Sequence, residues 1–427
     1  MTLPVRGVRT LERGGAFIAG ADDADALWLD PAGLAHAHGQ GTTAFLFDLA
    51  IVYAPVEYTR IDSDGNVQPA VTNLQPTQPI PTIAASFAVN DQLVIGAGFT
   101  APYSGLHRYE EGGTQRYASV SLAGSSFILV TLGAAYAIND QLRIGATLQD
   151  VVSTIDANIM LSACPGDTIC MPEDRDFDAL AHIHQSDYFS PSGSLGVQYD
   201  VAAPVTLGLS LQAPSRVDAT GSLTAQLPTN PLFENAQVVG DKVHMRFTLP
   251  PILRAGVEVH PMPELRIEAA LDVELWSLHD EIEIEPEDVR IEQIPTVGTY
   301  TIGPMAIPRH YKTSFSPALG VEYHTGPVMF GGGIAYETAA APPQYVSVLT
   351  VDAPKFMFGL GGGYESEGWQ LGAAIGYAKV SDVNVPLADA AVPQLNPVRN
   401  PPEDIMINAG TYKSSYLIVG LRGARRF

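Results

Sequence analysis

The chain has 427 residues, including 40 Gly and 33 Pro, and only 16% of its residues are charged while 46% are hydrophobic. This composition favours many strands joined by turns over helices edged with Lys and Glu, so we expect an all-β protein. The net charge of −23 excludes nucleic acid as a partner, because binding to phosphates relies on Lys and Arg.

Residues 1–40 are rich in Gly and Ala and differ in pattern from the rest of the chain. Their first residues, MTLPVRGVRTLERGG, lack the continuous apolar core of a secretory signal, so we expect no signal peptide in the chain as given. Asp22, Asp23 and Asp25 could suggest a calcium site, but the spacing lacks a twelve-residue loop closed by Glu. A solvated or hydrogen-bonded acidic turn is the favoured interpretation.

One turn pattern recurs along the chain: an apolar stretch, a few Asn, Asp, Pro or Gly residues, and a new alternating stretch. The six copies are SFAVNDQLVIGAGF (86–99), AYAINDQLRIGATL (135–148), VQYDVAAPVTLGLSL (197–211), VEVHPMPELRIEAAL (257–271), VEYHTGPVMFGGGI (321–334) and GGYESEGWQLGAAI (362–375). Such connections are typical of hairpin turns. Short turns that alternate with long polar loops predict an outer-membrane β-barrel of about fourteen antiparallel strands.

The uncharged run at 117–139 is long enough for a transmembrane helix. Because it ends in the recurrent turn pattern, we interpret it as strand instead.

The clearest alternation covers residues 240–260 and continues into the next strand. Its apolar residues stand at odd positions: Val243, Met245, Phe247, Leu249, Leu253, Ala255, Val257 and Val259. Its even positions hold Lys242, His244, Arg246, Thr248, Arg254, Gly256 and Glu258. This pattern predicts that the odd residues face lipid and the even residues a polar lumen. The run is too long for an ordinary β-sandwich strand.

Cys164 and Cys170 stand close together in CPGDTIC, which favours a small disulfide, although two free thiols remain an alternative. Two thiolates alone do not complete a structural zinc site. His182 and His184 could flank a metal on one strand face, but the spacing fixes no third ligand. The chain has no Gly-x-Ser-x-Gly motif and no Gly-rich phosphate loop before a helix, so we expect neither catalysis nor a cofactor.

Several segments resemble the FadL/TodX family of outer-membrane transporters for long-chain fatty acids and hydrocarbons. They are RGGAFIAGADDADALWLDPAGLA, IPTIAASFAVNDQLVIGAGFTAPYSGL (80–106), LPPILRAGVEVHPMPELRIEAALDVELW (249–276) and the C-terminal SSYLIVGLRGARRF. The resemblance implies an N-terminal hatch at residues 1–40 that plugs a barrel at 41–427. Asp30-Pro31-Ala32 stands where the family has Asn-Pro-Ala. Phe17, Leu27, Trp28 and Leu29 are expected to wedge against the barrel wall, and the alternative is that they contact ligand.

The resemblance also implies a mechanism in the bacterial outer membrane. A hydrophobic ligand is caught at extracellular loops, passes into a hatch-gated barrel that we expect to be monomeric, and leaves sideways into the membrane lipid at a kinked third strand. Gly96, Gly98 and Pro102 share a parity in that strand and could cause a kink. The alternative is that these small residues make room for the hatch.

Two sets of residues are candidates for ligand contact. By resemblance, two loops form an outer capture groove, or else a loop mini-core, with Ile159, Met160, Leu161, Met171, Phe177, Leu180, Leu232 and Phe233. By parity, Lys242, Arg246 and Arg254 face the lumen and could bind a carboxylate. They could instead pair with Glu258, Glu268, Asp272 and Glu274. A different class of function, a docking or secretion-associated barrel with acidic loops as its interface, predicts a blocked lumen and a stable protein partner.

Overall fold

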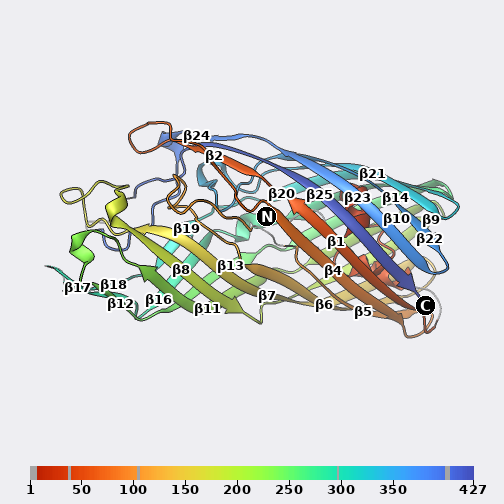
Figure 1. The fold of residues 1–427 in the computed structure, drawn as a ribbon. Helices are drawn as coiled ribbons and strands as arrows, with labels where there is room; N and C mark the ends of the chain where they lie inside the picture. Colours follow the sequence, from red (N-terminus) through yellow and green to blue (C-terminus); the bar gives the residue numbers. More distant parts are fainter. Residues whose placement is uncertain (1–6, 37–39, 103–105, 296–297, 400–403) are drawn as a thin grey trace.

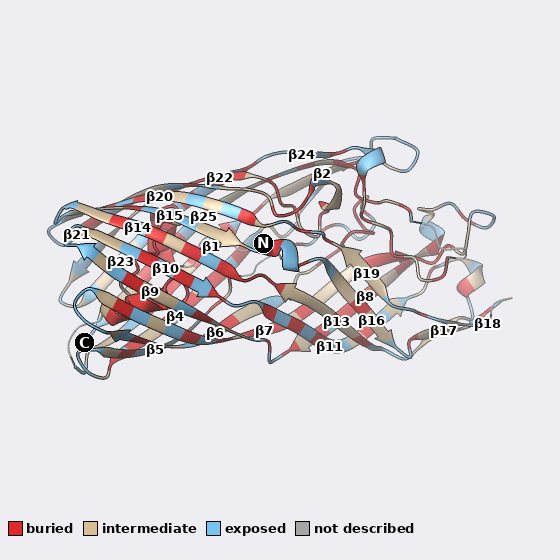
Figure 2. Cartoon of the chain, turned by 180° about the vertical axis from the view of Figure 1, so that it is seen from behind, coloured by how far each residue is buried: buried red, intermediate tan, exposed pale blue. Residues whose placement is uncertain are grey.

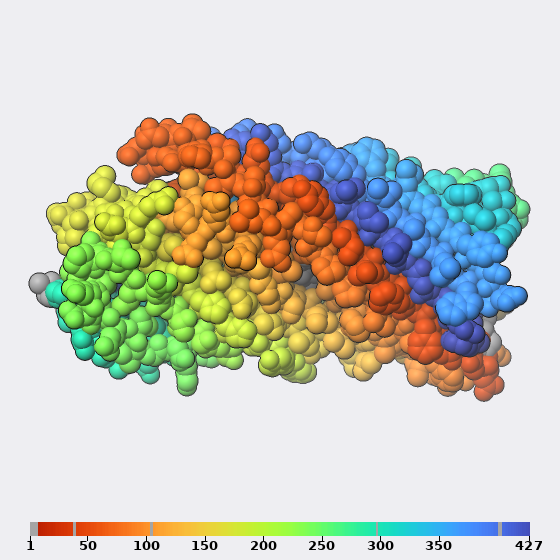
Figure 3. Space-filling view, in the orientation of Figure 1, coloured from red at the N-terminus to blue at the C-terminus, as the bar shows by residue number. Residues whose placement is uncertain are grey.

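The computed structural model describes residues 7–36, 40–102, 106–295, 298–399 and 404–427. These residues form a closed antiparallel barrel of 14 strands that encloses the N-terminal segment (Figure 1). The first wall strand pairs with the last from Ala44 opposite Arg426 to Tyr53 opposite Leu417, and this pairing closes the barrel. Figure 3 shows these two strands side by side on the outer surface, in red-orange and dark blue. The predicted fold class is confirmed.

Nine of the wall strands are single segments. They are β1 (Thr43–Tyr53), β4 (Thr77–Ala88), β5 (Leu93–Thr100), β6 (Ser126–Ala137), β7 (Leu142–Ser162), β21 (Val328–Glu337), β22 (Lys355–Ser366), β23 (Trp369–Val380) and β25 (Gly410–Arg426). The other five are each broken into two segments. They are β9 (Pro191–Ala202) with β8 (Asp178–Asp187), β10 (Val205–Gln212) with β11 (Ser215–Gln226), β14 (Ile252–Met262) with β13 (Lys242–Leu249), β15 (Leu265–Glu274) with β16 (Glu281–Glu287), and β20 (Ser314–Thr325) with β19 (Met305–Pro308).

Smaller elements occupy the lumen, the long loops and one strand break. The lumen holds α1 (Val8–Glu12), η1 (Ala24–Leu27) and η2 (Pro31–His36). The remaining elements are β2 (Val56–Arg60), β3 (Val71–Thr72), η3 (Arg175–Phe177), η4 (Pro231–Phe233), β12 (Gln237–Val239), η5 (Trp276–Leu278), β17 (Arg290–Ile294), β18 (Gly298–Thr301), η6 (Pro343–Tyr345), β24 (Val383–Val385) and η7 (Leu387–Asp389).

All six recurrent motifs form the short turns that the sequence predicts. They join β4 to β5, β6 to β7, β9 to β10, β14 to β15, β20 to β21 and β22 to β23. In the first turn the Asn90 side chain accepts hydrogen bonds of 2.8 Å from the backbone amides of Gln92 and Leu93. Asn139 does the same in the second turn. The nearly identical motifs therefore encode the same local geometry.

The half of the wall next to these turns, called here the belt half, has an apolar outer face. Its exposed side chains include Phe45, Phe47, Leu207, Leu209, Leu211, Leu253, Val257, Leu271, Ile375 and Leu421. Its inner face carries buried polar residues such as Arg254, Glu258, Glu268, Glu322 and Arg422. Figure 2 shows the resulting alternation of buried and exposed residues along the strands. An apolar outer belt around a polar interior is typical of barrels that span a bilayer.

The other half, called here the distal half, comprises β8, β11, β13, β16 and β19 and reverses this arrangement. Its outward side chains are polar and include Arg216, Asp218, Lys242, Arg246, Glu283, Glu285 and Glu287. Its inward side chains are apolar and include Ala181, Ile183, Val217, Ala219, Val243, Met245 and Ile284. The distal half therefore has a water-compatible outside and an apolar inside.

Proline-containing breaks cause the reversal. Between β13 and β14 the chain passes through Pro250-Pro251, which supply no backbone donors to the ladder. Leu249 and Ile252 are both buried on the inner face, so the parity that faces inward changes from odd to even across the break. Ala213-Pro214 interrupts the neighbouring strand between β10 and β11 in the same way.

The break corrects two sequence predictions. Lys242 and Arg246 do not face the lumen, because they lie on the outer surface, where Arg246 pairs with Glu283 and Glu285. Val243, Met245, Phe247 and Leu249 do not face lipid, because they point into the distal half. Arg254 and the apolar residues on either side of it face as predicted, with Arg254 inside and Leu253 and Val257 outside.

The uncharged run at 117–139 supplies strand β6 and is not a transmembrane helix. Among the described residues, no helix combines the length and apolar character needed to cross a bilayer.

Candidate ligand-binding site

The hatch occupies the belt half of the lumen and packs against much of its wall, and a polar space of about 300 Å³ remains between hatch residues such as Arg9 and Asp22 and wall residues such as Arg422. Phe17, Leu27, Trp28 and Leu29 are all buried, and Trp28 Nε1 donates a 2.9 Å hydrogen bond to Thr131 Oγ1 on β6. A methyl group added at Gly98 would lie 2.9 Å from the Trp28 ring. Small residues in β5 thus make room for the hatch, which was the alternative interpretation of Gly96 and Gly98.

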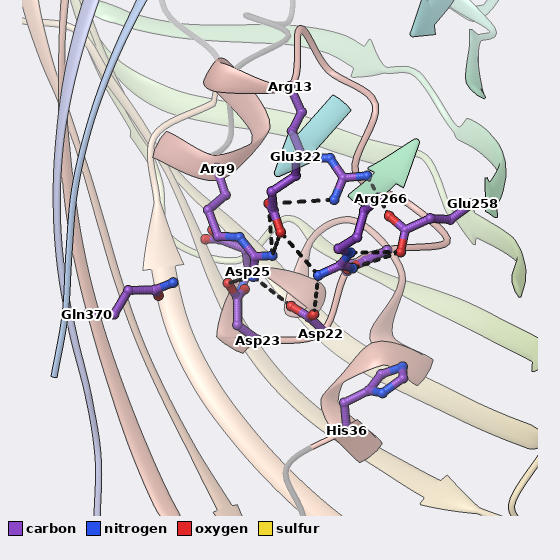
Figure 4. Close-up of polar contacts among 12 residues, drawn as sticks. Arg9, Arg13, Asp22, Asp23, Asp25, His36, Glu258, Arg266, Glu322 and Gln370 are labelled. Atoms are coloured by element: carbon purple, nitrogen blue, oxygen red, sulfur yellow. Dashed lines mark hydrogen bonds and ion pairs between the residues drawn. The ribbon is translucent and has the colours of Figure 1, made fainter. Parts of the chain in front are cut away.

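Ion pairs join the hatch to the wall (Figure 4). Arg9 contacts Asp22 at 2.6 Å and Glu322 at 3.1 Å, and Arg266 contacts Asp22 at 2.7 Å. Arg13 contacts Glu258 at 2.5 Å. The acidic turn of the hatch is therefore held by arginines.

A second part of this network joins the hatch to the last strand. Arg422 on β25 contacts Asp23 at 2.5 Å, Asp25 at 2.8 Å and Asp48 of β1 at 3.2 Å. Elsewhere in the hatch, Asp30 accepts a 3.1 Å hydrogen bond from the Ala32 amide. An apolar molecule moving straight down the lumen would have to displace these buried charged contacts, which is energetically unfavourable.

An apolar cavity of about 260 Å³ lies on the distal side of the hatch. Residues of β6, β7, β8, β13, β16 and the long loops line it, and no described hatch residue does. The apolar part of the lining includes Phe127, Ile155, Ile159, Ile183, Met245, Phe247, Leu249, Trp276, Ile282, Ile284, Ile307 and Val348. A concave, mostly apolar space with few polar groups is typical of a small-molecule site.

Aromatic rings form a connected group in this cavity. The Phe247 ring lies 6.2 Å from Phe127 and 5.9 Å from His279. The Trp276 ring lies 5.7 Å from His279 and 6.0 Å from Tyr311. Burial, and secondarily the nearby Arg309, lowers the pKa of His279 to about 3, so the ring is neutral at physiological pH. His279 therefore serves as an uncharged part of the lining.

The wall beside the cavity is interrupted where β5 ends. Pairing of β5 with β4 and with β6 stops at Thr100, opposite Thr82 and Leu129. Beyond that point β4 continues to Thr77 and β6 to Ser126 without a β5 residue between them. Gln78 on one side and Phe127 on the other both line the cavity. Pro102 is buried just after the end of β5 and outside any strand.

The residues expected in an outer groove do not form one continuous surface. Ile159 lines the cavity, and Met160 and Leu161 are buried near it. Phe177 and Phe233 are buried with their rings 6.2 Å apart, as in a loop mini-core, and Leu180 and Leu232 are partly buried. Met171 is exposed on the surface. Of these eight residues, Phe177 and Phe233 form a buried loop contact, and Ile159 alone lines the cavity.

The remaining predicted residues lie apart from the cavity. Arg254 is buried in the belt half, where its Nη2 donates to Gln212 at 3.1 Å and its Nε lies 3.7 Å from Asp272. Cys164 and Cys170 are joined by a disulfide in the loop after β7. His182 and His184 both contact the Asp156 carboxylate at 3.3 Å, and the described residues contain no group of three or more side chains suited to a metal ion.

Sequence reasoning missed much of the cavity lining. Alternation places Met245, Phe247 and Leu249 toward lipid only if the strand runs through Pro250-Pro251 without a break. Trp276, His279 and Tyr311 stand at or near strand breaks, where alternation does not indicate on which side of the wall a side chain lies. The consecutive prolines were the available signal for the reversal.

The fold and this site define a class of protein: a hatch-plugged outer-membrane β-barrel of the transport type. The chain belongs to the outer membrane protein transport family OMPP1/FadL/TodX, whose sequence profile matches residues 13–400. This family consists of passive transport channels rather than enzymes, and membership does not favour the docking alternative.

Several solved structures share this fold. A Pseudomonas aeruginosa FadL homologue superposes with a TM-score of 0.80 at 16% identity over 99% of both chains. The Ralstonia pickettii toluene transporter TbuX gives a TM-score of 0.66 at 17% identity, over 99% of this chain and 98% of that one. The P. putida toluene transporter TodX gives 0.65 at 15% identity with the same coverage. No curated protein sequence matches significantly.

Proposed function

We propose that this chain is a monomeric channel that carries a hydrophobic small molecule through the outer membrane passively and releases it sideways into the lipid. The observation that carries the proposal is the position of the apolar cavity directly beside the interruption of the wall at Thr100. In this arrangement the belt half lies in the bilayer, and the distal half projects on the extracellular side.

The two halves of the barrel have different roles in this transport. The distal half encloses apolar side chains within a polar exterior, so it offers a hydrophobic molecule a site outside the membrane. The belt half is occupied by the hatch and its ion pairs, which oppose straight passage. The hatch then acts as a seal below the route rather than as a gate within it.

Lateral release is physically favourable for such a ligand. A molecule that moves from the cavity between β4 and β6 enters the hydrocarbon region without exposure of its apolar surface to periplasmic water. The structural relatives include proteins named as toluene transporters and as a monoaromatic hydrocarbon channel. We therefore include both aromatic hydrocarbons and long-chain fatty acids among the ligand classes to test.

The experiment measures uptake of labelled toluene and oleate by cells that express this chain. Ala157→Trp on β7 fills the cavity, and Thr154→Trp on the outward face of the same strand is the matched control. We expect uptake above that of empty cells for the wild type and the control, and a fall to near the empty-cell rate for Ala157→Trp. Transport through this cavity is refuted if neither compound enters faster than in empty cells, or if Ala157→Trp transports as well as the wild type.

A further inference from the structure

His279 is a buried polar residue in the wall of the apolar cavity. It follows η5 in the break between β15 and β16, where its backbone amide donates a 2.8 Å hydrogen bond to the Trp276 carbonyl. The carbonyl of the next residue, Asp280, accepts bonds of 2.7 and 2.8 Å from the amides of Arg309 and His310. His279 is 8% exposed and lines the cavity. The ring is therefore held at a defined place in the cavity wall.

The contacts of this ring decide which of its nitrogens carries the proton. His279 Nδ1 lies 3.0 Å from the carbonyl oxygen of Thr248, which can only accept a hydrogen bond, so Nδ1 donates it. Burial, and secondarily the nearby Arg309, lowers the pKa of the ring to about 3, so no second proton binds at neutral pH. Nε2 therefore keeps its lone pair and can act only as an acceptor.

His279 Nε2 has no donor of its own. Within the described part of the chain, the bond to Thr248 is the one hydrogen bond of the His279 side chain. The Trp276 ring lies 5.7 Å away, but its indole Nε1 donates to Glu274 at 2.5 Å. A polar atom withdrawn from bulk water without a partner is energetically unfavourable, so a ligand that supplies a donor gains affinity here.

The described lining contains no other acceptor of this kind. It has no Asp and no Glu, although the chain has 46 acidic residues. The other histidine of the lining, His107, is hydrogen-bonded to Ser119 at 2.7 Å. His279 Nε2 is thus the one imidazole acceptor of the described lining that no side chain already occupies.

The surroundings of His279 suit an aromatic molecule. The ring centres of Phe247, Trp276 and Tyr311 lie 5.9, 5.7 and 5.3 Å from that of His279. Aromatic rings attract one another at such separations in edge-to-face and tilted arrangements. The cavity thus combines one neutral acceptor with a group of aromatic side chains.

We propose that His279 Nε2 accepts a hydrogen bond from the hydroxyl of an alkylphenol whose ring lies among Phe247, Trp276 and Tyr311, so that the cavity recognises phenols by their proton. The inference rests on the proposed function, because it uses the same cavity. A phenol keeps its proton at neutral pH, as the tyrosine side chain with its pKa of about 10 does. The rest of the molecule is apolar and can enter the lipid.

The test compares binding of three radiolabelled compounds of similar shape to the full chain in lipid nanodiscs at pH 7, with binding to empty nanodiscs subtracted. p-Cresol can donate a hydrogen bond, 4-methylanisole can only accept one, and p-xylene does neither. For His279→Phe we expect the affinity for p-cresol to fall about tenfold, because its hydroxyl is left without a partner. The affinities for 4-methylanisole and p-xylene should stay within about twofold of the wild-type values.

Two further variants isolate the role of the acceptor. His279→Gln should lose only part of the affinity for p-cresol, because the amide can donate to Thr248 and its oxygen can accept from the ligand. His184→Phe makes the same exchange as His279→Phe at an exposed position on the outer face of β8. It should bind all three compounds as the wild type does.

Each outcome has a defined meaning. If His279→Phe loses no more affinity for p-cresol than for p-xylene, the proposal for His279 is overturned, but hydrophobic transport stands. Equal losses for p-cresol and 4-methylanisole also overturn it, because the oxygen of the ligand and not its proton would then be recognised. If the wild type binds none of the three compounds, the proposed function fails together with this inference. Retained p-xylene binding shows that the variant barrel is folded, and if His279→Phe does not fold, the same comparison in His279→Gln decides.

Discussion

Arg246 and Arg254 stand on the same parity of one alternating segment, yet their guanidinium groups lie on opposite sides of the barrel wall. Arg246 is outside and contacts Glu283 at 3.2 Å, whereas Arg254 is 2% exposed inside the lumen. Pro250-Pro251 between them reverses the inward parity. Because of this reversal, polar side chains line the lumen in the belt half and apolar side chains line it in the distal half.

Cysteine labelling tests this reversal. In intact cells we expect a membrane-impermeant maleimide to label Arg246→Cys rapidly, because position 246 lies on the water-exposed outer face. Phe247→Cys should react much more slowly, because Phe247 lines the cavity. The native cysteines form a disulfide and supply an unreactive background. Fast labelling at 247 and none at 246 would mean that the wall is not reversed.

Removal of a buried cation from the hatch network should destabilise the barrel strongly. Arg422→Met leaves Asp23, Asp25 and Asp48 without their shared partner, and loss of one member of a buried ion pair costs about 3–5 kcal/mol. Lys413→Met on the same strand removes an exposed contact with Glu57 and should change stability little. Urea unfolding in lipid vesicles measures both. Similar unfolding midpoints for the two variants would show that the network does not hold the hatch.

Stability should also depend on the protonation of His279. Burial lowers the pKa of His279 to about 3 in the folded protein, whereas an unfolded histidine has a pKa of about 6.5. Above pH 6.5 the ring is neutral in both states and makes no pH-dependent contribution. Below pH 6.5 only the unfolded chain takes up the proton, so the free energy of unfolding falls by about 1.4 kcal/mol per pH unit, or about 2 kcal/mol at pH 5.

His279→Phe isolates this contribution, because phenylalanine does not titrate. The free energy of unfolding is measured for both proteins at pH 8 and pH 5. We expect the wild type to lose more stability than the variant over this interval. Equal losses would mean that His279 is not held neutral in the folded state.

The barrel was predictable because its strongest signals are local. The two NDQL turns are set by Asn90 and Asn139, whose side chains bond to amides two and three residues ahead. Such a turn specifies its hairpin through local contacts alone, whatever surrounds the hairpin in the barrel. The number of turns therefore predicts the number of strands without knowledge of which residues line the lumen.

The cavity was not predictable by the same means. Alternation assigns faces only relative to a continuous ladder, and Phe247 changes sides because the ladder breaks at Pro250. The cavity also unites Phe127, Phe247, Trp276 and Tyr311 from separate segments, and no local pattern brings these together.

In the proposed route, the ligand leaves the cavity sideways into the lipid while the hatch stays in place. A methyl group added at Gly15 of the hatch would lie 3.8 Å from Cβ of Ala318 on β20, a separation that suits a disulfide. Gly15 has a φ of 98°, so a cysteine there strains the backbone, and the reduced double variant, which carries the same strain, is the reference for the oxidised one. We therefore propose to measure toluene and oleate uptake by cells that carry Gly15→Cys with Ala318→Cys, before and after reduction. The account predicts equal uptake in the oxidised and reduced states for whichever compound the wild type transports. Uptake that stops on oxidation and returns on reduction would contradict it, because the ligand would then need the hatch to move.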